Sequence, residues 1–439
     1  MATSNNNIIV VGAGAAGLFA SNILMQRGKN VILLEKKHQA GLKLRITGKG
    51  RCNITNSKPK EEYFKHISSP KFFEPAFDNF TNTDLCSFFK ERGLDLIEER
   101  GGRIFPKSGK SLDVFLSLLK PLEESPRVRI EKNCEVEHLI VKNHKVVGVS
   151  TNLGDFYADV AILATGGRTY PSTGSTGDGY YIAEEVGHSI VEPLPALVGL
   201  RTKEGYPKEL QDFLVKNCEV CITDDRHKTV AKLFGDVYLD EYGLSGPVML
   251  SLSRVVAKDL DRGARLFLCL DFKPKVSKEK LLQEIHQVFS QRRTEDVVSV
   301  LRKWFAKPLV KDVLQICKLN GKAMAKNIKE EDYNTLAWYM KERRQPIVGD
   351  MGWKEAIITM GGISLKEINP QTMQSKLVKG LSFCGEVIDL DADTGGYNLQ
   401  IAFSTAKLCA ESGFGHSSTS KPASAAAFAM RSSAAPANP

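Results

Sequence analysis

Three glycines near the start of the chain, Gly12, Gly14 and Gly17, have the GxGxxG spacing of a dinucleotide-binding turn. In such a turn Gly12 permits a tight bend, Gly14 leaves no side chain between the backbone and a pyrophosphate, and Gly17 lets a helix pack close to the preceding strand. The helix that follows directs free N–H groups and a positive dipole end at the phosphates. The spacing therefore predicts a dinucleotide site.

A carboxylate follows at the position where such sites bind the adenosine ribose. Glu35 lies 18 residues after Gly17, where its side chain can accept hydrogen bonds from both ribose hydroxyls. The same charge repels a 2′-phosphate. FAD or NAD is therefore expected in preference to NADP.

The residues around these groups have the patterns of the elements that must position them. The β-branched run 8–11 predicts a buried strand, residues 15–27 have a helical pattern, and residues 31–34 predict a second strand that ends at Glu35. Strand, glycine turn, helix, strand and terminal acid form one βαβ unit. This combination favours a dinucleotide site over a purely structural turn.

A segment rich in glycine and cations, residues 38–56, predicts a loop and not a core element. Its glycines alternate with lysine and arginine, which suits a loop that wraps an extended anionic ligand; an exposed basic loop is the alternative. Further along, a predicted buried strand runs into Thr165, Gly166 and Gly167. Residues 177–179 then begin a helix whose N-terminus could face a second anionic group.

The composition fits a globular chain of more than one domain. Its 439 residues exceed a typical single core, so two or three domains are expected, and the hydrophobic (42%) and charged (25%) fractions are ordinary. The net charge of +9 comes from Lys and Arg scattered along the chain, which favours an anionic ligand; nucleic acid is not an expected partner. Glycines interrupt the apolar run 8–25, so no membrane span is predicted.

The nine cysteines are dispersed and odd in number, which indicates a reducing compartment, and a cytoplasmic location is expected. Cys218 and Cys221 form a lone CxxC within a strand pattern that places them on opposite faces. Ordinary packing explains this pair better than a redox or metal role. The eight histidines show no ligand spacing, and no metal site is predicted.

Changes of pattern along the chain predict a discontinuous cofactor-binding domain with two insertions. Residues 81–92 and 111–123 predict helices, residues 128–149 predict antiparallel strands, and EPLP at 192–195 has the composition of a linker. Short alternating strands with one helix at 247–260 come next, followed by about four helical segments. The predicted boundaries are 1–192 and 345–415 for the cofactor-binding domain, 193–273 for the mostly-β insertion, 274–344 for the helical insertion and 416–439 for a disordered tail.

Four motifs resemble those of one family of flavoproteins. They are GAGAAG with Glu35, TGKGRCNITN at 47–56, LSGP at 244–247 and CGEVIDLDADTGGYNLQ at 384–400. From about residue 6 to residue 415 the chain is similar to the BaiN-like flavoproteins, which are NAD(P)/FAD-dependent oxidoreductases or aminoacetone-oxidase-like proteins. Asp240 and Ala406 depart from the family pattern, and neither lies at an expected FAD contact.

The resemblance implies an α/β fold, with a glutathione-reductase-like FAD-binding Rossmann domain, an inserted mostly-β domain and a small inserted helical domain. Glu386 resembles the acid that binds the ribityl hydroxyls. Asn398 and Leu399 would lie at a helix N-terminus, whose N–H groups stabilise the negative charge of reduced flavin. The residues implied to contact FAD are Gly12, Gly14, Ala15, Ala16, Gly17, Glu35, Lys36, Arg45, Thr47, Gly48, Gly50, Arg51, Cys52, Asn53, Val136, Thr165, Gly166, Gly385, Glu386, Asn398 and Leu399.

The function implied is an FAD-dependent oxidoreductase that transfers a hydride between flavin and a small organic substrate. The chain has one GxGxxG, so a dedicated second nucleotide domain is not expected, and NADH, NADPH and oxygen are all left open as redox partners. Arg103, Tyr170 and Tyr397 are candidates for positioning a substrate, but no catalytic residue is predicted. Two alternatives are a tRNA-modifying flavoenzyme, which would need a clustered cationic face, and a non-catalytic flavin-bound scaffold or redox sensor.

Overall fold

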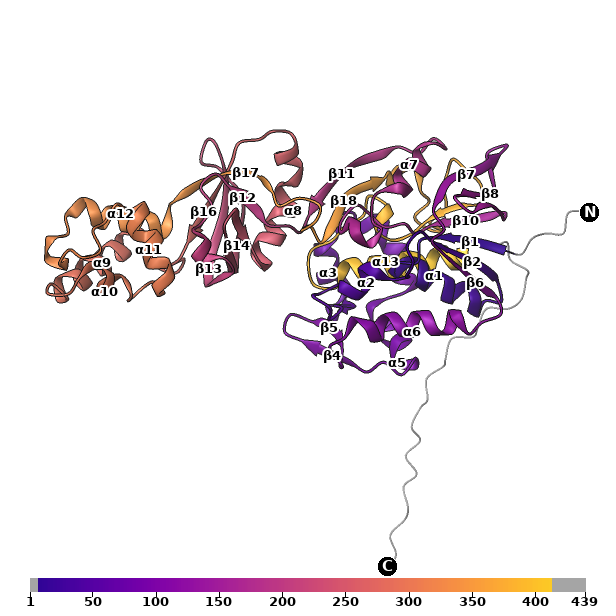
Figure 1. The fold of residues 1–439 in the computed structure, drawn as a ribbon, viewed down its shortest axis with the longest axis horizontal. Helices are drawn as coiled ribbons and strands as arrows, with labels where there is room; N and C mark the ends of the chain where they lie inside the picture. Colours follow the sequence, from indigo (N-terminus) through magenta and orange to yellow (C-terminus); the bar gives the residue numbers. More distant parts are fainter. Residues whose placement is uncertain (1–6, 413–439) are drawn as a thin grey trace, which may run out of the picture.

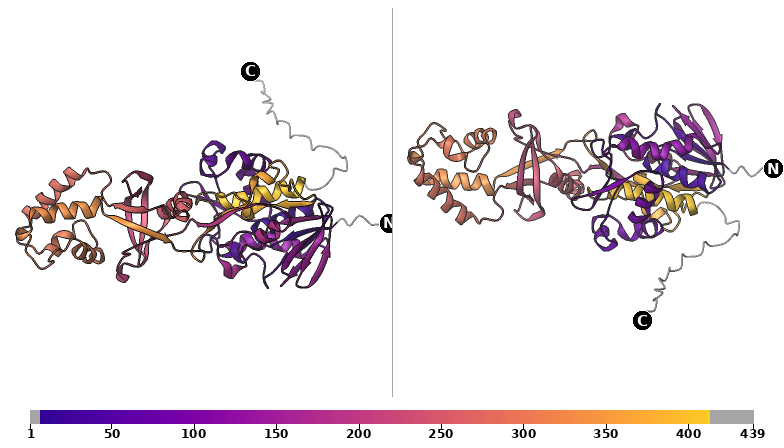
Figure 2. Two further views of the ribbon diagram at one scale, coloured as in Figure 1. Left: turned by 90° about the horizontal axis from the view of Figure 1, so that it is seen from above. Right: turned by 90° about the horizontal axis from the view of Figure 1, so that it is seen from below.

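The computed structural model describes residues 7–412, so the predicted tail at 416–439 lies outside the described residues. Figure 1 and Figure 2 show an elongated molecule in which three parts follow one another. An α/β part contains both ends of the described chain, a β-barrel lies in the middle, and a group of helices forms the far end. Within residues 7–412, no helix has the length and apolar character needed to cross a membrane.

A five-stranded parallel sheet forms the centre of the α/β part. Its strands, in spatial order, are β19 (Leu381–Phe383), β10 (Val160–Leu163), β1 (Asn7–Val11), β2 (Asn30–Glu35) and β6 (Val128–Lys132). β1 pairs with β10 on one side and β2 on the other, which explains why its β-branched run is buried. β19 completes the sheet from near the other end of the chain, and this α/β arrangement confirms the predicted fold class.

The prediction of antiparallel strands across residues 128–149 was wrong for its first part. β6 pairs parallel with β2, because it follows helix α6 (Ser111–Glu123) and returns in the direction of its neighbour. Only β7 (Val136–Lys142) and β8 (Lys145–Thr151) are antiparallel, together with β9 (Gly154–Tyr157). Side-chain alternation alone does not distinguish the direction of a strand.

Helix α1 (Ala15–Gln26) connects β1 to β2 and packs against the last helix, α13 (Tyr397–Ser412). The ring of Phe19 in α1 lies 5.1 Å from that of Phe403 in α13 and 4.6 Å from that of Phe88 in α5 (Asn82–Glu91). The helix that carries the predicted phosphate-binding turn is therefore anchored by the C-terminal helix.

The predicted loop at 38–56 contains more structure than its composition indicated. Helix α2 (Leu42–Ile46) lies within it, Cys52 and Ile54 are buried, and β3 (Thr55–Asn56) pairs with β5 (Arg103–Pro106). β5 also pairs with β4 (Leu96–Glu99). The four cations between Lys43 and Arg51 gave this segment a polar composition, although a few apolar residues fix it in the core.

Two strands lead out of and back into the α/β part. β11 (Ile190–Ala196) pairs antiparallel with β18 (Ile358–Ile363). The prediction of a linker at 192–195 was therefore wrong, since EPLP lies inside β11. A register shift between Val191 and Leu194 accommodates the first proline, which cannot donate a hydrogen bond to its neighbour.

The middle part is a closed six-stranded barrel. Its strands, in spatial order, are β12 (Leu200–Thr202), β15 (Gly243–Ser245), β14 (Thr229–Asp240), β13 (Phe213–Asp224), β16 (Leu266–Asp271) and β17 (Arg344–Asp350). β17 pairs with both β12 and β16, so residues 345–350 belong to the barrel and not to the α/β part to which the sequence assigned them. In β13, Cys218 is buried and Cys221 is partly exposed, as expected for opposite faces.

Helices α9 (Lys278–Gln291), α10 (Val297–Leu301), α11 (Lys307–Ile316) and α12 (Glu330–Lys341) form the far end of the molecule. Their buried residues belong to the same hydrophobic core as those of the barrel. Helix α8 (Pro247–Asp261) packs against β14 of the barrel and also against β11 of the α/β part. α8 thus packs against both the barrel and the α/β part and connects them.

Candidate functional site

A cavity of about 1050 Å³ opens at the carboxyl ends of three parallel strands. Val11, Leu34 and Ala164, at or just after the ends of β1, β2 and β10, line its floor. Ligands of open α/β sheets bind at this edge. The opposite wall comes from the barrel, so the cavity lies between the two parts of the molecule.

The glycine turn has the geometry that its spacing predicts. The N–H of Gly12 donates to the carbonyl of Leu34 at 2.8 Å, and φ of Gly12 is +97°. A Cβ on Gly17 would lie 1.8 Å from the carbonyl oxygen of Gly12, whereas a Cβ on Gly14 would meet no atom within 4 Å. Gly17 therefore serves close packing, and Gly14 borders the open cavity.

Glu35 reaches the cavity from the end of β2. Its Oε2 accepts a hydrogen bond from the N–H of Ala13 at 3.0 Å, and its Oε1 accepts one from the N–H of Lys37 at 2.9 Å. Burial raises the pKa of Glu35, against the opposing effect of these two bonds. The carboxylate is thus held in place beside the glycine turn.

Lys43 is a functional candidate that the sequence did not single out. Its ammonium group donates to Oε2 of Glu386 and to Oγ1 of Thr169, both at 2.6 Å. Oε1 of Glu386 accepts from the N–H of Thr359 at 2.8 Å. The predicted ribityl-binding acid therefore also fixes α2. No local pattern distinguishes Lys43, because it is one of four cations in a single loop.

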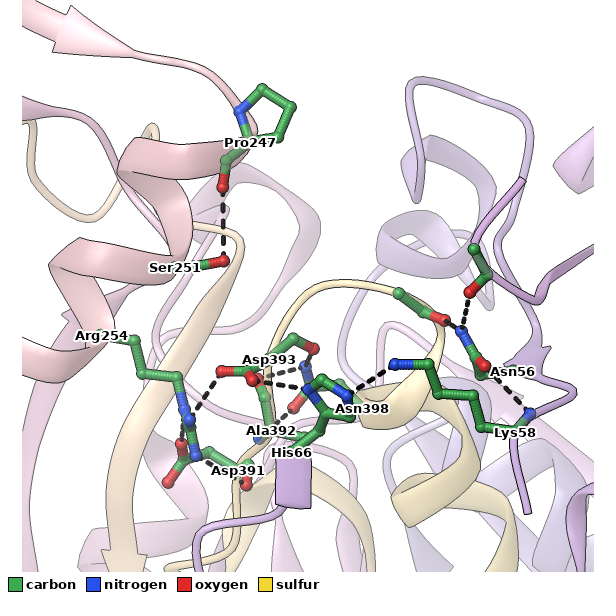
Figure 3. A network of polar contacts seen from close by, with 12 residues as sticks. Asn56, Lys58, His66, Pro247, Ser251, Arg254, Asp391, Ala392, Asp393 and Asn398 are labelled. Carbon is green, nitrogen blue, oxygen red and sulfur yellow. Dashed lines mark hydrogen bonds and ion pairs between the residues drawn. The ribbon is translucent and has the colours of Figure 1, made fainter. Parts of the chain in front are cut away.

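The C-terminal motif forms the turn that precedes α13. Asn398 holds this turn with its side chain: Oδ1 accepts from the N–H of Ala392 at 2.9 Å, and Nδ2 donates to the carbonyls of Ala392 and Asp393 at 2.9 and 3.1 Å (Figure 3). Gly396 has φ of +97°, and a Cβ there would lie 2.4 Å from the carbonyl oxygen of Thr55. The first turn of α13 is thereby placed at the cavity wall, where Asn398 and Leu399 lie.

Most of the predicted FAD contacts meet at this cavity. The predicted residues that line it are Gly12, Gly14, Ala15, Ala16, Glu35, Lys36, Thr47, Gly48, Val136, Thr165, Gly166, Glu386, Asn398 and Leu399. The predicted residues that do not line it are Gly17, Arg45, Gly50, Arg51, Cys52, Asn53 and Gly385. Arg51 forms an ion pair with Glu99 and lies over the ring of Phe105 at 4.5 Å, so its charge is directed away from the cavity.

The three candidate substrate-positioning residues occupy different places. Tyr170 lines the cavity. Arg103 does not line the cavity, and its Nη2 lies 3.6 Å from Oε2 of Glu99. Tyr397 is buried, and the centre of its ring lies 4.5 Å from that of the His66 ring, on which it stacks. Among these three, only Tyr170 can meet a ligand in the cavity without a rearrangement.

The wall on the barrel side is mainly apolar. It includes Tyr238 of β14, Pro247 and Leu250 of α8, and Met351 just after β17. Asp212 and Glu355 add two carboxylates to the cavity lining. This wall suits an organic ligand that is oriented by a few polar groups.

Comparison with known proteins identifies the family. Residues 6–412 match the model of the HI0933-like protein Rossmann domain. The chain belongs to the HI0933-like family. Its membership confirms the predicted resemblance and makes the chain an FAD-dependent oxidoreductase.

Two relatives of this HI0933-like chain cover nearly all of it. The 3-dehydro-bile acid delta(4,6)-reductase of Clostridium scindens is 29% identical over 405 residues, which are 92% of this chain and 98% of that protein. The ribosomal RNA dihydrouridine synthase of Haemophilus influenzae is also 29% identical over 405 residues, 92% of this chain and 97% of that protein. Among solved structures, an open flavocytochrome c3 fumarate reductase has 19% identity and a TM-score of 0.44, covering 93% of this chain and 78% of that chain.

The cavity of the HI0933-like chain fits FAD in its chemistry. The space beside Gly14 is open to a pyrophosphate, and the hydroxyl Oγ1 of Thr165 is buried without a hydrogen-bond partner in residues 7–412. Glu35 and Glu386 both line the cavity, and their carboxylates would accept hydrogen bonds from hydroxyl groups of the cofactor. Across the same residues, no cluster of three or more His, Cys, Asp or Glu side chains could hold a metal ion.

Proposed function

We propose that this chain transfers a hydride between FAD and an organic substrate whose carbon–carbon double bond is conjugated to a carbonyl group. The observation that carries the proposal is a single cavity lined both by the dinucleotide-type turn and by apolar residues of the barrel. The names of the two relatives support the substrate class. One reduces delta(4,6) double bonds of a 3-dehydro compound, and the other forms dihydrouridine.

The reaction requires a hydride at the carbon β to the carbonyl and a proton at the α carbon. When bound, reduced FAD would supply the hydride, which carries both electrons of the reduction. Tyr170 is the side chain that we propose as the proton donor. Burial, followed by the nearby Glu355, raises the pKa of Tyr170, so its Oη keeps its proton at neutral pH until an α carbanion forms.

The other cavity residues bind the substrate and exclude water. Leu250, Met351 and Tyr238 cover the substrate from the barrel side. Apolar cover of this kind strengthens the polar contacts inside the site, because water no longer competes for them. We further propose that NADH or NADPH restores the electrons by binding transiently at the same cavity.

Two anaerobic stopped-flow measurements test these steps. Mixing the oxidised protein with NADH or NADPH is expected to bleach the flavin; no bleaching by either would refute the NAD(P)H step. Mixing the photoreduced protein with a panel of cyclic enones is expected to reoxidise the flavin, with one saturated ketone formed per flavin. Failure across enones of different size, while oxygen reoxidises the flavin normally, would refute the substrate class.

A second candidate substrate is a uridine within RNA, and the charge distribution favours it. Residues 274–344 contain 16 Lys and Arg and 9 Asp and Glu, so this helical insertion carries +7 of the net +9 of the whole chain. The excess is thus clustered, in contrast to the scattered charge described from the sequence. Several of the acids are engaged locally, as Asp312 is by Arg343 at 3.1 Å and Glu295 is by Arg292 at 2.6 Å.

Ten exposed cations on this insertion form no ion pair within residues 7–412, whereas exposed Lys303 pairs with Glu284. The ten are Lys275, Lys280, Arg293, Arg302, Lys307, Lys311, Lys318, Lys322, Lys326 and Lys329. Lys326 donates its N–H to the carbonyl of Arg293 at 3.2 Å, so these two cations are neighbours. Salt-dependent binding of ribosomal RNA fragments, weakened by Arg293→Glu with Lys326→Glu, would support the RNA substrate; equal binding by the charge-reversed variant would exclude a role for this surface.

A further inference from the structure

Helix α8 touches the candidate active site and a turn of the α/β part at the same time. Its first turns carry Pro247 and Leu250, which line the cavity. Arg254, one helical turn after Leu250, points to the turn at residues 391–393 that precedes α13 (Figure 3). A shift of α8 on substrate binding would therefore move that turn as well.

Arg254 binds the turn through three hydrogen bonds. Its Nε and Nη1 donate to Oδ1 of Asp391 at 2.5 Å and Oδ1 of Asp393 at 2.8 Å, and its Nη2 donates to the carbonyl of Asp391 at 3.3 Å. The side chain of Arg254 is 14% exposed and that of Asp391 is 4% exposed. Charge-assisted bonds with this little water around them are strong and geometrically specific.

The opposite side of the turn is held by His66. Its Nδ1 lies 2.8 Å from Oδ2 of Asp393, and its Nε2 lies 3.0 Å from the ammonium group of Lys58. Because an ammonium group can only donate, Nε2 accepts and Nδ1 carries the proton that is donated to Asp393. Asp393 is therefore clamped between Arg254 and His66, as Figure 3 shows.

The clamped turn leads directly into the wall of the cavity. Asn398 binds Ala392 and Asp393 with its side chain, and its own backbone belongs to the first turn of α13. Asn398 and Leu399 both line the cavity. A movement of Arg254 would thus displace the turn at residues 391–393 and, through it, the N-terminus of α13 at the cavity wall.

We propose that Arg254 is a positioning residue that couples the α8 side of the substrate cavity to the reduction potential of the bound flavin. The coupling rests on the proposed function in one respect, that FAD occupies this cavity. N–H groups at a helix N-terminus stabilise negative charge, which reduced flavin carries. Loosening the turn moves these groups away and makes the reduction potential more negative.

The test compares three variants of the full-length protein. Arg254→Gln removes the charge-assisted bonds, Arg254→Lys keeps the charge without the planar fork, and Arg262→Gln removes an exposed arginine from the end of the same helix. In the FAD-free protein, hydrogen exchange across residues 391–400 is expected to become about tenfold or more faster in Arg254→Gln and to change less in Arg254→Lys. Arg262→Gln is expected to exchange like the wild type.

The second readout is the reduction potential of the FAD-loaded protein. It is expected to become more negative in the order wild type, Arg254→Lys, Arg254→Gln, with Arg262→Gln unchanged. The proposal would be overturned if hydrogen exchange in Arg254→Gln matched the wild type. It would also be overturned if Arg254→Gln and Arg262→Gln shifted the reduction potential equally. If neither the wild type nor any variant binds FAD, the proposed function is refuted instead. The exchange measurement on the FAD-free proteins would still test the contacts of Arg254.

Discussion

Replacing Gly14 by Ala separates the binding role of the glycine turn from its structural role. Gly14 has φ of −82° and ψ of −166°, an extended conformation that alanine adopts without strain. Its added Cβ would meet no protein atom within 4 Å and would project into the cavity. We therefore expect Gly14→Ala to fold normally and to bind FAD poorly.

The magnitudes follow from these contacts. Alanine is a poorer N-cap than glycine but loses less chain entropy on folding, so the free energy of unfolding without FAD should change by less than about 1 kcal/mol. A pyrophosphate pushed back by the Cβ loses at least one charge-assisted hydrogen bond, about 1.5–3 kcal/mol, which is roughly a 10- to 150-fold loss of FAD affinity. The matched change Gly17→Ala places a Cβ 1.8 Å from the oxygen of Gly12 and should destabilise the fold by more than about 3 kcal/mol.

Urea unfolding of the FAD-free proteins and calorimetric titration with FAD measure both quantities. The reasoning predicts two opposite profiles: weak FAD binding with normal stability for Gly14→Ala, and low stability for Gly17→Ala. Wild-type FAD affinity in Gly14→Ala would refute the placement of the pyrophosphate beside this residue. A loss of stability in Gly14→Ala as large as that in Gly17→Ala would refute the structural contrast.

Three further changes test other parts of the site. Burial raises the pKa of Glu35 above its ordinary 4.5, so FAD affinity should fall as the solution is acidified through that raised pKa, and titration calorimetry should find this dependence absent in Glu35→Gln. Burial raises the pKa of Asp389 to about 6 from an ordinary 3.8, so its contribution to stability is present at about pH 4 and lost as the pH rises through 6. Asp389→Asn should therefore gain about 1–2 kcal/mol of stability relative to wild type as the pH rises from 4 to 6, since partial exposure to solvent weakens the full effect of the shift. Urea unfolding at each pH measures this gain, and a constant difference would contradict the shift. Tyr170→Phe should slow the oxidation of reduced flavin by an enone about 100- to 10,000-fold in stopped flow while leaving FAD binding unchanged; an unaltered rate would remove Tyr170 as proton donor.

Local patterns predicted the glycine turn and the elements beside it well. The glycine turn, the helix that begins at Ala15 and the strand that ends at Glu35 depend on contacts between residues that are close in sequence. Each of these features can be recognised from a short stretch of neighbouring residues. The structure places them as that signature indicates.

Contacts between distant segments were harder to predict. Lys43 reaches Glu386 across 343 positions, and Arg254 reaches Asp391 across 137 positions, and nothing in either local pattern indicates the partner. The linker expected at 192–195 became a strand because β18, far along the chain, offers it hydrogen bonds. These features depend on tertiary pairing, which a window of sequence does not contain.

The uptake of FAD by the purified chain tests the assignment of the cavity most directly. Titration of the cofactor-free protein with FAD, followed by flavin fluorescence and calorimetry, is predicted to saturate at one FAD per chain. The bound flavin should be released on unfolding, and Gly14→Ala should weaken its uptake. A protein that stays folded and colourless with no saturable uptake of FAD would contradict the site proposed between the α/β part and the barrel.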